Sequence, residues 1–158
     1  MIGIDANLLI YAGIVPKKSK DNTKKLKDLT RRSGILFDNL QGNILAISSI
    51  ALAEVLVPVS NKKKGKLISE LSKRFVIADF TIQAATIASS LWAEHKKLPA
   101  DEQYDKRIVL SADTKIIASL KAVGVSTMYS HDRKCRKIAN LTMDAFDLPT
   151  HSEKLFEK

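Results

Sequence analysis

The chain has 158 residues, of which 45% are hydrophobic and 27% are charged, as is usual for one soluble globular domain with its own core. Lys and Arg number 26 against 17 Asp and Glu. The formal net charge of +9 favours a polyanionic partner such as nucleic acid, although solubility alone also explains it. Cys135 is the only cysteine, which excludes an intrachain disulfide and a thiolate metal cluster.

Short strand-like runs alternate with helix-like segments along the chain. In chain order we predict a strand at 2–4, a helix at 7–12, a lysine-rich loop at 16–22, a helix at 23–39, a strand at 44–48, helices at 50–57 and 62–74, a strand at 75–78, a helix at 82–97 capped by Thr81, a loop at 98–103, a helix at 113–122, a strand at 125–129, a helix at 132–140 and a strand at 141–146. The helix at 82–97 is expected to bury a stripe formed by Ile82, Ala85, Ala88, Ser89 and Trp92.

The alternation of strands and helices predicts an α/β fold with a parallel sheet covered on both faces. Residues 1–150 are expected to form a single domain and 151–158 a short C-terminal tail. The first residues lack the pattern of a signal peptide, and no apolar run approaches the roughly 20 residues needed to cross a bilayer. We therefore expect a cytoplasmic protein that does not bind membranes.

Four acidic residues lie where a parallel sheet places its ligand site, beyond the carboxyl ends of the strands. Asp5 ends the first strand, and Glu54 is the only charge in an apolar helical segment. Asp113 begins a predicted helix, and Asp132 follows the fourth strand and opens the next helix. Each has an alternative explanation, because Asp is a favoured helix cap and Glu54 can face solvent from an amphipathic helix.

The four acids together predict a metal site. All four would face the same edge of the sheet, where clustered carboxylates repel one another and a hard divalent cation is the usual remedy. Oxygen ligands favour Mg²⁺ or Mn²⁺ over zinc. We therefore expect Asp5, Glu54, Asp113 and Asp132 to bind one or two such ions.

The sequence resembles the PIN-domain family in four segments that follow the family's order: 2–7 (IGIDAN), 48–54 (SSIALAE), 112–119 (ADTKIIAS) and 130–132 (SHD). The resemblance covers nearly the whole chain and implies a three-layer α/β/α sandwich that cleaves RNA with the help of metal. The best-known small members are VapC-like toxins, each paired with an antitoxin protein. Where the family commonly has Thr-Asn-Asp, this chain has Ser-His-Asp, so Ser130 keeps the hydroxyl and His131 is the unusual residue.

The resemblance assigns a catalytic role to each acid. Asp5 is the central metal ligand, Asp113 and Asp132 complete the ligand set, and Glu54 binds metal directly or orients the attacking water. One or two metals would neutralise the phosphate and activate that water.

Other polar residues beside the acids are expected to support them. Asn7 and Ser130 can hydrogen-bond to ligand carboxylates, although Asn7 could equally be a turn residue. The basic residues that follow the last acid could grip RNA phosphates or form a solvated helix face: Arg133, Lys134, Arg136 and Lys137.

The function that fits best is a metal-dependent endoribonuclease, as the toxin of a type II toxin–antitoxin pair. Its partners would be RNA, an antitoxin and a second copy of the chain, because PIN toxins generally pair and Trp92 could supply an apolar contact. The alternative is a PIN-like module that binds nucleic acid or protein without cleaving, against which the retention of all four acids argues. A receiver domain ranks lower, because no pair of acids follows the first strand.

Overall fold

The computed structural model describes residues 1–15, 23–104 and 106–150. In these residues five parallel strands form one sheet in the order β3-β2-β1-β4-β5. The strands are β1 (Ile2–Ile4), β2 (Leu45–Ser48), β3 (Val76–Ala78), β4 (Thr127–Tyr129) and β5 (Asp144–Phe146). The predicted parallel sheet is confirmed, and each strand lies within the range predicted for it.

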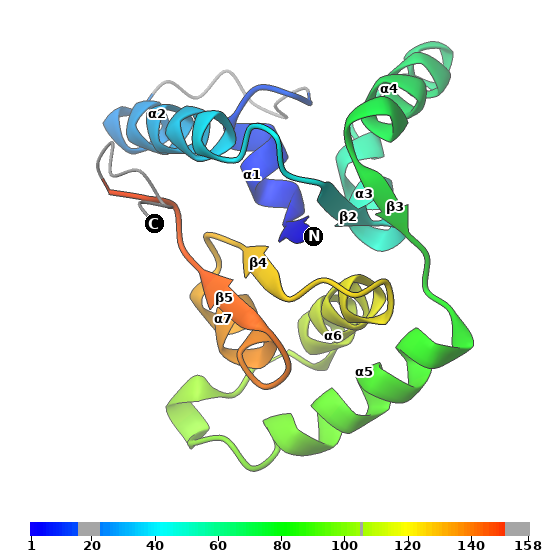
Figure 1. Cartoon of the computed structure of the whole chain (residues 1–158). Helices are drawn as coiled ribbons and strands as arrows, with labels where there is room; N and C mark the ends of the chain where they lie inside the picture. Colours follow the sequence, from blue (N-terminus) through cyan, green and yellow to red (C-terminus); the bar gives the residue numbers. More distant parts are fainter. Residues whose placement is uncertain (16–22, 105, 151–158) are drawn as a thin grey trace.

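Helices connect the strands and cover both faces of the sheet. They are α1 (Ala6–Tyr11), α2 (Lys24–Asn39), α3 (Ser49–Leu56), α4 (Asn61–Arg74), α5 (Ile82–His95), the 3₁₀ helix η1 (Ala100–Glu102), α6 (Arg107–Ala122) and α7 (Arg133–Ala139). Figure 1 shows α1 and α2 on one face, α6 and α7 on the other, and α5 packed outside α6. This arrangement is the expected three-layer α/β/α sandwich. None of the helices in the described residues is both long enough and apolar enough to cross a bilayer.

The helix α6 corrects the predicted start of the helix at 113–122. It begins at Arg107, so Asp113 lies in its second turn and not at its N-terminus. The sequence hides these first turns, because Ile108 and Val109 are β-branched and both are exposed to solvent.

The buried stripe of α5 also differs from the prediction. The residues that face the core are Ala84, Ala88, Leu91 and His95, whereas Ile82 is 89% exposed. Small residues occur on both faces of this helix, so its periodicity does not distinguish the buried face.

Gly3 allows α6 to lie close against β1. A Cβ atom at Gly3 would lie 2.9 Å from Leu120 Cδ1 and 3.2 Å from Val125 Cγ1. Leu120 and Asp113 are seven residues apart, which puts them on one face of the helix. Because α6 directly precedes β4 and runs antiparallel to the strands, its first half lies at the carboxyl edge of the sheet, and so does Asp113.

Candidate active site

The site lies where the strand order of the sheet reverses. From β1 the chain proceeds to β2 and β3 on one side, and returns to β4 and β5 on the other, which is the position where open α/β sheets bind ligands. The backbone N–H of Asp5 donates to the carbonyl of Tyr129 at 3.1 Å. The buried Ser130 hydroxyl donates to Asp5 Oδ2 at 2.5 Å, so the ends of β1 and β4 are joined by a side chain as well as by backbone.

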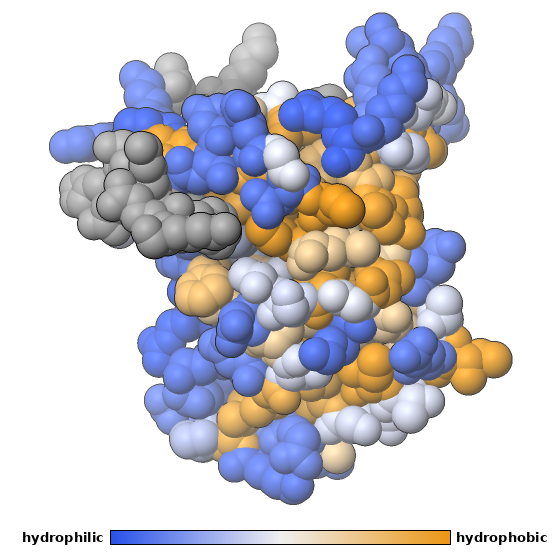
Figure 2. All heavy atoms as spheres, in the orientation of Figure 1, coloured by the Kyte–Doolittle hydropathy of each residue, from blue (hydrophilic) through white to orange (hydrophobic). Residues whose placement is uncertain are grey.

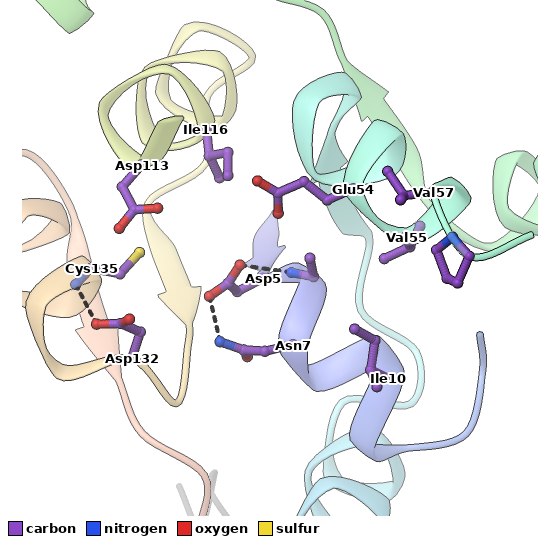
Figure 3. A pocket seen from close by; sticks show the side chains of 12 residues that line it. Asp5, Asn7, Ile10, Glu54, Val55, Val57, Asp113, Ile116, Asp132 and Cys135 are labelled. Atoms are coloured by element: carbon purple, nitrogen blue, oxygen red, sulfur yellow. Dashed lines mark hydrogen bonds between the residues drawn. The ribbon is translucent and has the colours of Figure 1, made fainter. Parts of the chain in front are cut away.

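The four predicted acids line a single cavity of about 420 Å³. Asp5 comes from the end of β1, Glu54 from α3, Asp113 from α6 and Asp132 from the start of α7. Figure 3 shows their carboxylates arranged around a common open space. The rest of the lining is mostly apolar and is formed by Ala6, Asn7, Ile10, Val55, Val57, Pro58, Ile116 and Cys135. The structure therefore brings together all four acids that the sequence singled out. Below, the cavity that they line is called the acid pocket.

Asp5 is a helix cap and part of the pocket at the same time. Its Oδ1 accepts from the backbone N–H of Ala6 at 2.7 Å, and its Oδ2 accepts from Asn7 Nδ2 at 2.9 Å and from Ser130. Burial raises the pKa of Asp5, and the negative charge of Asp132 adds to the increase, while the hydrogen bonds oppose it. A buried carboxylate with another acid beside it favours the approach of a cation.

Asp113 cannot cap α6, because it lies inside that helix. Burial raises its pKa to about 7 against a hydrogen bond from Tyr104, and the charges of Asp5, Asp132 and Glu54 add to the increase. The Tyr104 hydroxyl donates to Asp113 Oδ2. Near neutral pH this carboxyl is thus poised between its two protonation states, so a bound cation would shift it to the ionised one.

Asp132 and Glu54 complete the pocket from its more exposed side. Asp132 is the N-cap of α7, and its Oδ1 accepts from the backbone N–H groups of Lys134 at 2.7 Å and Cys135 at 3.0 Å. The capping role considered for Asp132 is thus present, alongside its place in the cavity. Glu54 is exposed on α3, yet its carboxylate is directed into the cavity (Figure 3).

The donors around the pocket suit a hard cation. Asn7 lines the site, and its buried Oδ1 is an acceptor without a hydrogen-bond donor in the described part of the chain. It adds a neutral oxygen to four carboxyl groups, which is the ligand chemistry of Mg²⁺ and Mn²⁺. Within the described ranges, no group of three His, Cys, Asp or Glu side chains is arranged so that it could hold a metal ion as the side chains stand. The fit therefore rests on the kinds of oxygen atoms present and on their convergence.

The basic residues after Asp132 have contacts within the protein. Lys134 Nζ donates to the carbonyl of Gln103 at 2.9 Å, and Lys137 pairs with Glu102 at 2.7 Å. Both contacts tie α7 to the loop between α5 and α6. Arg133, in contrast, is exposed.

Arg136 belongs to an ionic cluster on the other side of Ser130. Its guanidinium donates to the Ser130 carbonyl at 2.7 Å and lies 3.3 Å from Asp147 Oδ2. His131 Nδ1 lies 2.9 Å from Asp147 Oδ1, and Arg32 reaches the same oxygen at 4.0 Å. These four residues, Arg32, His131, Arg136 and Asp147, are called the Asp147 cluster below.

Tyr104 is the residue beside the pocket that sequence reasoning missed. It lies between η1 and α6 and reaches Asp113 through its hydroxyl. A single tyrosine in an irregular segment belongs to no motif, and nothing in the sequence shows that the loop turns it toward an acid nine positions later. The lysine-rich stretch 16–22 and the tail 151–158, which the sequence analysis also discussed, lie outside the described residues.

Comparison with known proteins identifies the family. A family model described as the PIN domain matches residues 2–141. The chain belongs to this family. No curated protein matches this PIN domain. Among solved structures it is similar to a chain in the crystal structure of VapBC2 from Rickettsia felis bound to a DNA fragment from their promoter, with a TM-score of 0.59 and 18% sequence identity over 93% of this chain and 98% of that one. At this identity the likeness shows a shared fold.

Proposed function

We propose that this PIN domain is a metal-dependent endoribonuclease that uses Mg²⁺ or Mn²⁺. The observation that carries the proposal is the acid pocket, in which carboxyl groups from four separate segments line one cavity. Burial is the main cause of the raised pKa values of Asp5 and Asp113, and the negative charges of the neighbouring acids raise them further, so ionising these carboxyl groups together is unfavourable. A divalent cation would offset the repulsion, so the arrangement is better explained by metal binding than by stability.

Each residue of the pocket is assigned a task in phosphodiester cleavage. Asp5 would be the central ligand, with Asp113 and Asp132 beside it, and Glu54 would bind metal or orient the attacking water. When bound, one or two cations would neutralise the phosphate and activate that water. Ser130 and the amide of Asn7 hold the Asp5 carboxylate in place through their hydrogen bonds to Oδ2.

RNA is the proposed substrate, because the net charge of +9 attracts polyanions. The candidate phosphate contacts stay as predicted: Arg133, Lys134, Arg136 and Lys137. Of these, Arg133 reaches solvent most readily, whereas Arg136 also holds the Asp147 cluster. A second basic region spans 17–27, of which the described part is the exposed N-terminal end of α2 with Lys24 and Lys25.

We further propose that the protein is the toxin of a type II pair and acts in the cytoplasm beside an antitoxin protein. The support is the family, together with the similarity to a chain from a structure whose description names VapBC2 and promoter DNA. Co-purification with the product of a neighbouring reading frame would test the antitoxin partner. A protein that purifies alone from cells expressing both frames would contradict it.

A homodimer is proposed on the exposed apolar residues near Trp92. Ile108 is 79% exposed and lines a surface hollow together with Trp92, and Trp92 also lines a surface groove of about 490 Å³ between α5 and α6. Exposed apolar groups that lie close together mark association surfaces. Light scattering should give twice the chain mass at micromolar concentration, and a monomer mass at all concentrations would contradict the proposal.

The experiment that tests the nuclease function is a paired assay on one protein preparation. Binding of a labelled RNA pool is followed by anisotropy, and its cleavage is followed on gels with Mg²⁺ or Mn²⁺. Wild type should bind and cleave. Asp113→Asn should bind RNA but cleave it more than 100-fold more slowly than wild type. Loss of a metal ligand should cost more than the 10–100-fold that is typical of residues that only support a ligand. Equal cleavage by both proteins would contradict the proposal, and binding without cleavage by wild type would favour the non-catalytic alternative.

A further inference from the structure

Asp113 is held differently from Asp5 and Asp132, through the hydroxyl of Tyr104. Asp5 is held by Ser130, Asn7 and its own helix, and Asp132 is held by the backbone of α7. Asp113 lies inside α6, where backbone N–H groups are already used by the helix. The hydroxyl of Tyr104, which comes from a separate loop, donates a hydrogen bond to Asp113.

The loop that carries Tyr104 is held by contacts of the two residues that precede it. Gln103 Nε2 donates to the carbonyl of Leu98 at 2.8 Å, which closes the loop on itself. Glu102 pairs with Lys137 of α7. The loop is therefore attached to the same helix that Asp132 caps, so α7 supports both Asp132 and the loop that reaches Asp113.

Tyr104 is also held by contacts of its own backbone and ring. The backbone N–H of Tyr104 donates to Nε2 of the buried His95 at 2.9 Å, and the centroids of the two rings lie 5.9 Å apart. Lys134 Nζ lies 5.7 Å from the centre of the tyrosine ring, on the side of α7. These contacts fix where the hydroxyl points, and it points at Asp113 Oδ2.

We propose that Tyr104 is a positioning residue for Asp113, whose carboxylate it holds in the orientation that receives a divalent cation. The inference rests on the proposed function, since it assigns a residue to the same metal site. A carboxylate offers about four lone-pair positions, so one hydrogen bond from a tyrosine leaves the others open to metal. Ligating carboxylates are commonly held by such a hydrogen bond, and its loss costs 10–100-fold in metal affinity or activity.

The test is Tyr104→Phe, which removes the hydroxyl and keeps the ring between His95 and Lys134. Calorimetric titration of the metal-free protein with Mn²⁺ should show an affinity about 10-fold lower than that of wild type. RNA affinity measured without metal should not change. The cleavage rate should fall at low Mn²⁺ and return to the wild-type value when Mn²⁺ is saturating, a rescue that a merely structural defect would not show.

Tyr129→Phe is the matched control, because it deletes a hydroxyl from a buried tyrosine whose ring packs against Phe146, away from Asp113. Its Mn²⁺ affinity should equal that of wild type. A second variant, Gln103→Ala, loosens the loop and leaves the hydroxyl in place, so it should weaken Mn²⁺ binding by a smaller factor.

Unchanged Mn²⁺ affinity in a folded Tyr104→Phe protein would overturn the inference. Should that variant not fold, as judged by circular dichroism, unchanged affinity in Gln103→Ala would overturn it instead. If wild type binds no Mn²⁺ at all, the proposed metal site itself fails. Wild-type binding with an unaffected Tyr104→Phe protein would remove Tyr104 alone and leave the nuclease proposal standing.

Discussion

The acid pocket and the Asp147 cluster both contact Ser130, and they differ in how the charges of their side chains are balanced. The Ser130 hydroxyl donates to Asp5 in the pocket, while its carbonyl accepts from Arg136 in the cluster. In the cluster a single carboxylate is surrounded by two guanidinium groups and an imidazole. In the pocket four carboxyl groups surround a cavity, and the pKa of two of them is raised.

The difference separates a structural use of charge from the functional use that we propose for the acid pocket. In the cluster the charges balance one another, and Arg32 ties the segment after β5 to α2, because it also donates to the backbone carbonyls of Leu148 and Pro149. In the acid pocket the hydrogen bonds offset only part of the cost of the carboxylate charges. A cation bound from solution would therefore lower the free energy of the pocket. Figure 2 shows hydrophilic residues in several separate areas of the face in view, with hydrophobic residues between them, so a hydrophilic surface alone does not mark a site. Unbalanced charge of one sign around a cavity does mark a candidate site.

The largest effect should come from removing one charge of the pocket. Because the folded-state pKa of Asp113 is raised to about 7, folding favours the protonated carboxyl, and stability falls as the pH rises from about 4 to 7. Asp113→Asn should therefore stabilise the metal-free protein at pH 8 by roughly 2–4 kcal/mol, since each pKa unit corresponds to about 1.4 kcal/mol. At pH 4 the gain should vanish.

Thermal unfolding in EDTA at the two pH values measures this effect. With Mn²⁺ present at pH 8 the order should reverse, because the cation stabilises wild type more than the variant. A variant that is less stable than wild type at pH 8 without metal would show that the pocket is not strained by its charges.

A smaller effect of opposite sign is expected in the Asp147 cluster. Asp147→Asn keeps the shape of the side chain but removes the carboxylate that faces the partly buried Arg136, while Arg32 keeps its pair with Asp28 at 3.8 Å. We expect a loss of about 1 kcal/mol, which for this chain length lowers Tm by roughly 2–4 °C. The control is Glu70→Gln, which removes an exposed pair with Lys66 and should not change Tm. An increase in Tm for Asp147→Asn would mean that the cluster, like the pocket, is a strained site.

The smallest effect concerns the two arginines of α7. Arg133 is exposed, so Arg133→Ala should leave Tm unchanged and lower the salt slope of RNA binding by about 0.7, the value for one phosphate contact on single-stranded nucleic acid. Arg136→Ala should instead lower Tm, because Arg136 holds Asp147 and the Ser130 carbonyl. Anisotropy over a salt series and thermal unfolding separate the two. An unchanged slope for Arg133→Ala would remove that residue from the RNA contacts.

The place of Asp5 and Asp132 could be predicted from the sequence, because a strand end in a parallel sheet has one possible edge. Glu54 followed from its isolation in an apolar segment. The location of Asp113 was predicted for a wrong reason, since it does not open its helix; its convergence with the others depends on α6 lying close against Gly3. That approach is a tertiary contact with no local signal.

The support around the acids could not be predicted at all. Tyr104 meets Asp113 because the loop is held by His95, Gln103 and Lys134, which lie in three different parts of the fold. The buried face of the alanine-rich α5 could not be predicted for a related reason, because small residues can lie on either the buried or the exposed face of a helix. Patterns of residue type thus predict where elements begin and which edge carries chemistry, but the contacts that orient a side chain arise only when elements pack.

The most direct test of the account is the titration of metal-free wild type and Asp5→Asn with Mn²⁺ by calorimetry. Asp5 is the most enclosed acid of the pocket, and Asn in its place removes the charge and keeps the size of the side chain, although the amide nitrogen cannot accept the hydrogen bonds that one carboxylate oxygen now receives. We expect saturable binding by wild type and a loss of most of that affinity in the variant, with both proteins folded. Equal binding by the two proteins, or no binding by wild type, would contradict the claim that these acids hold a divalent cation.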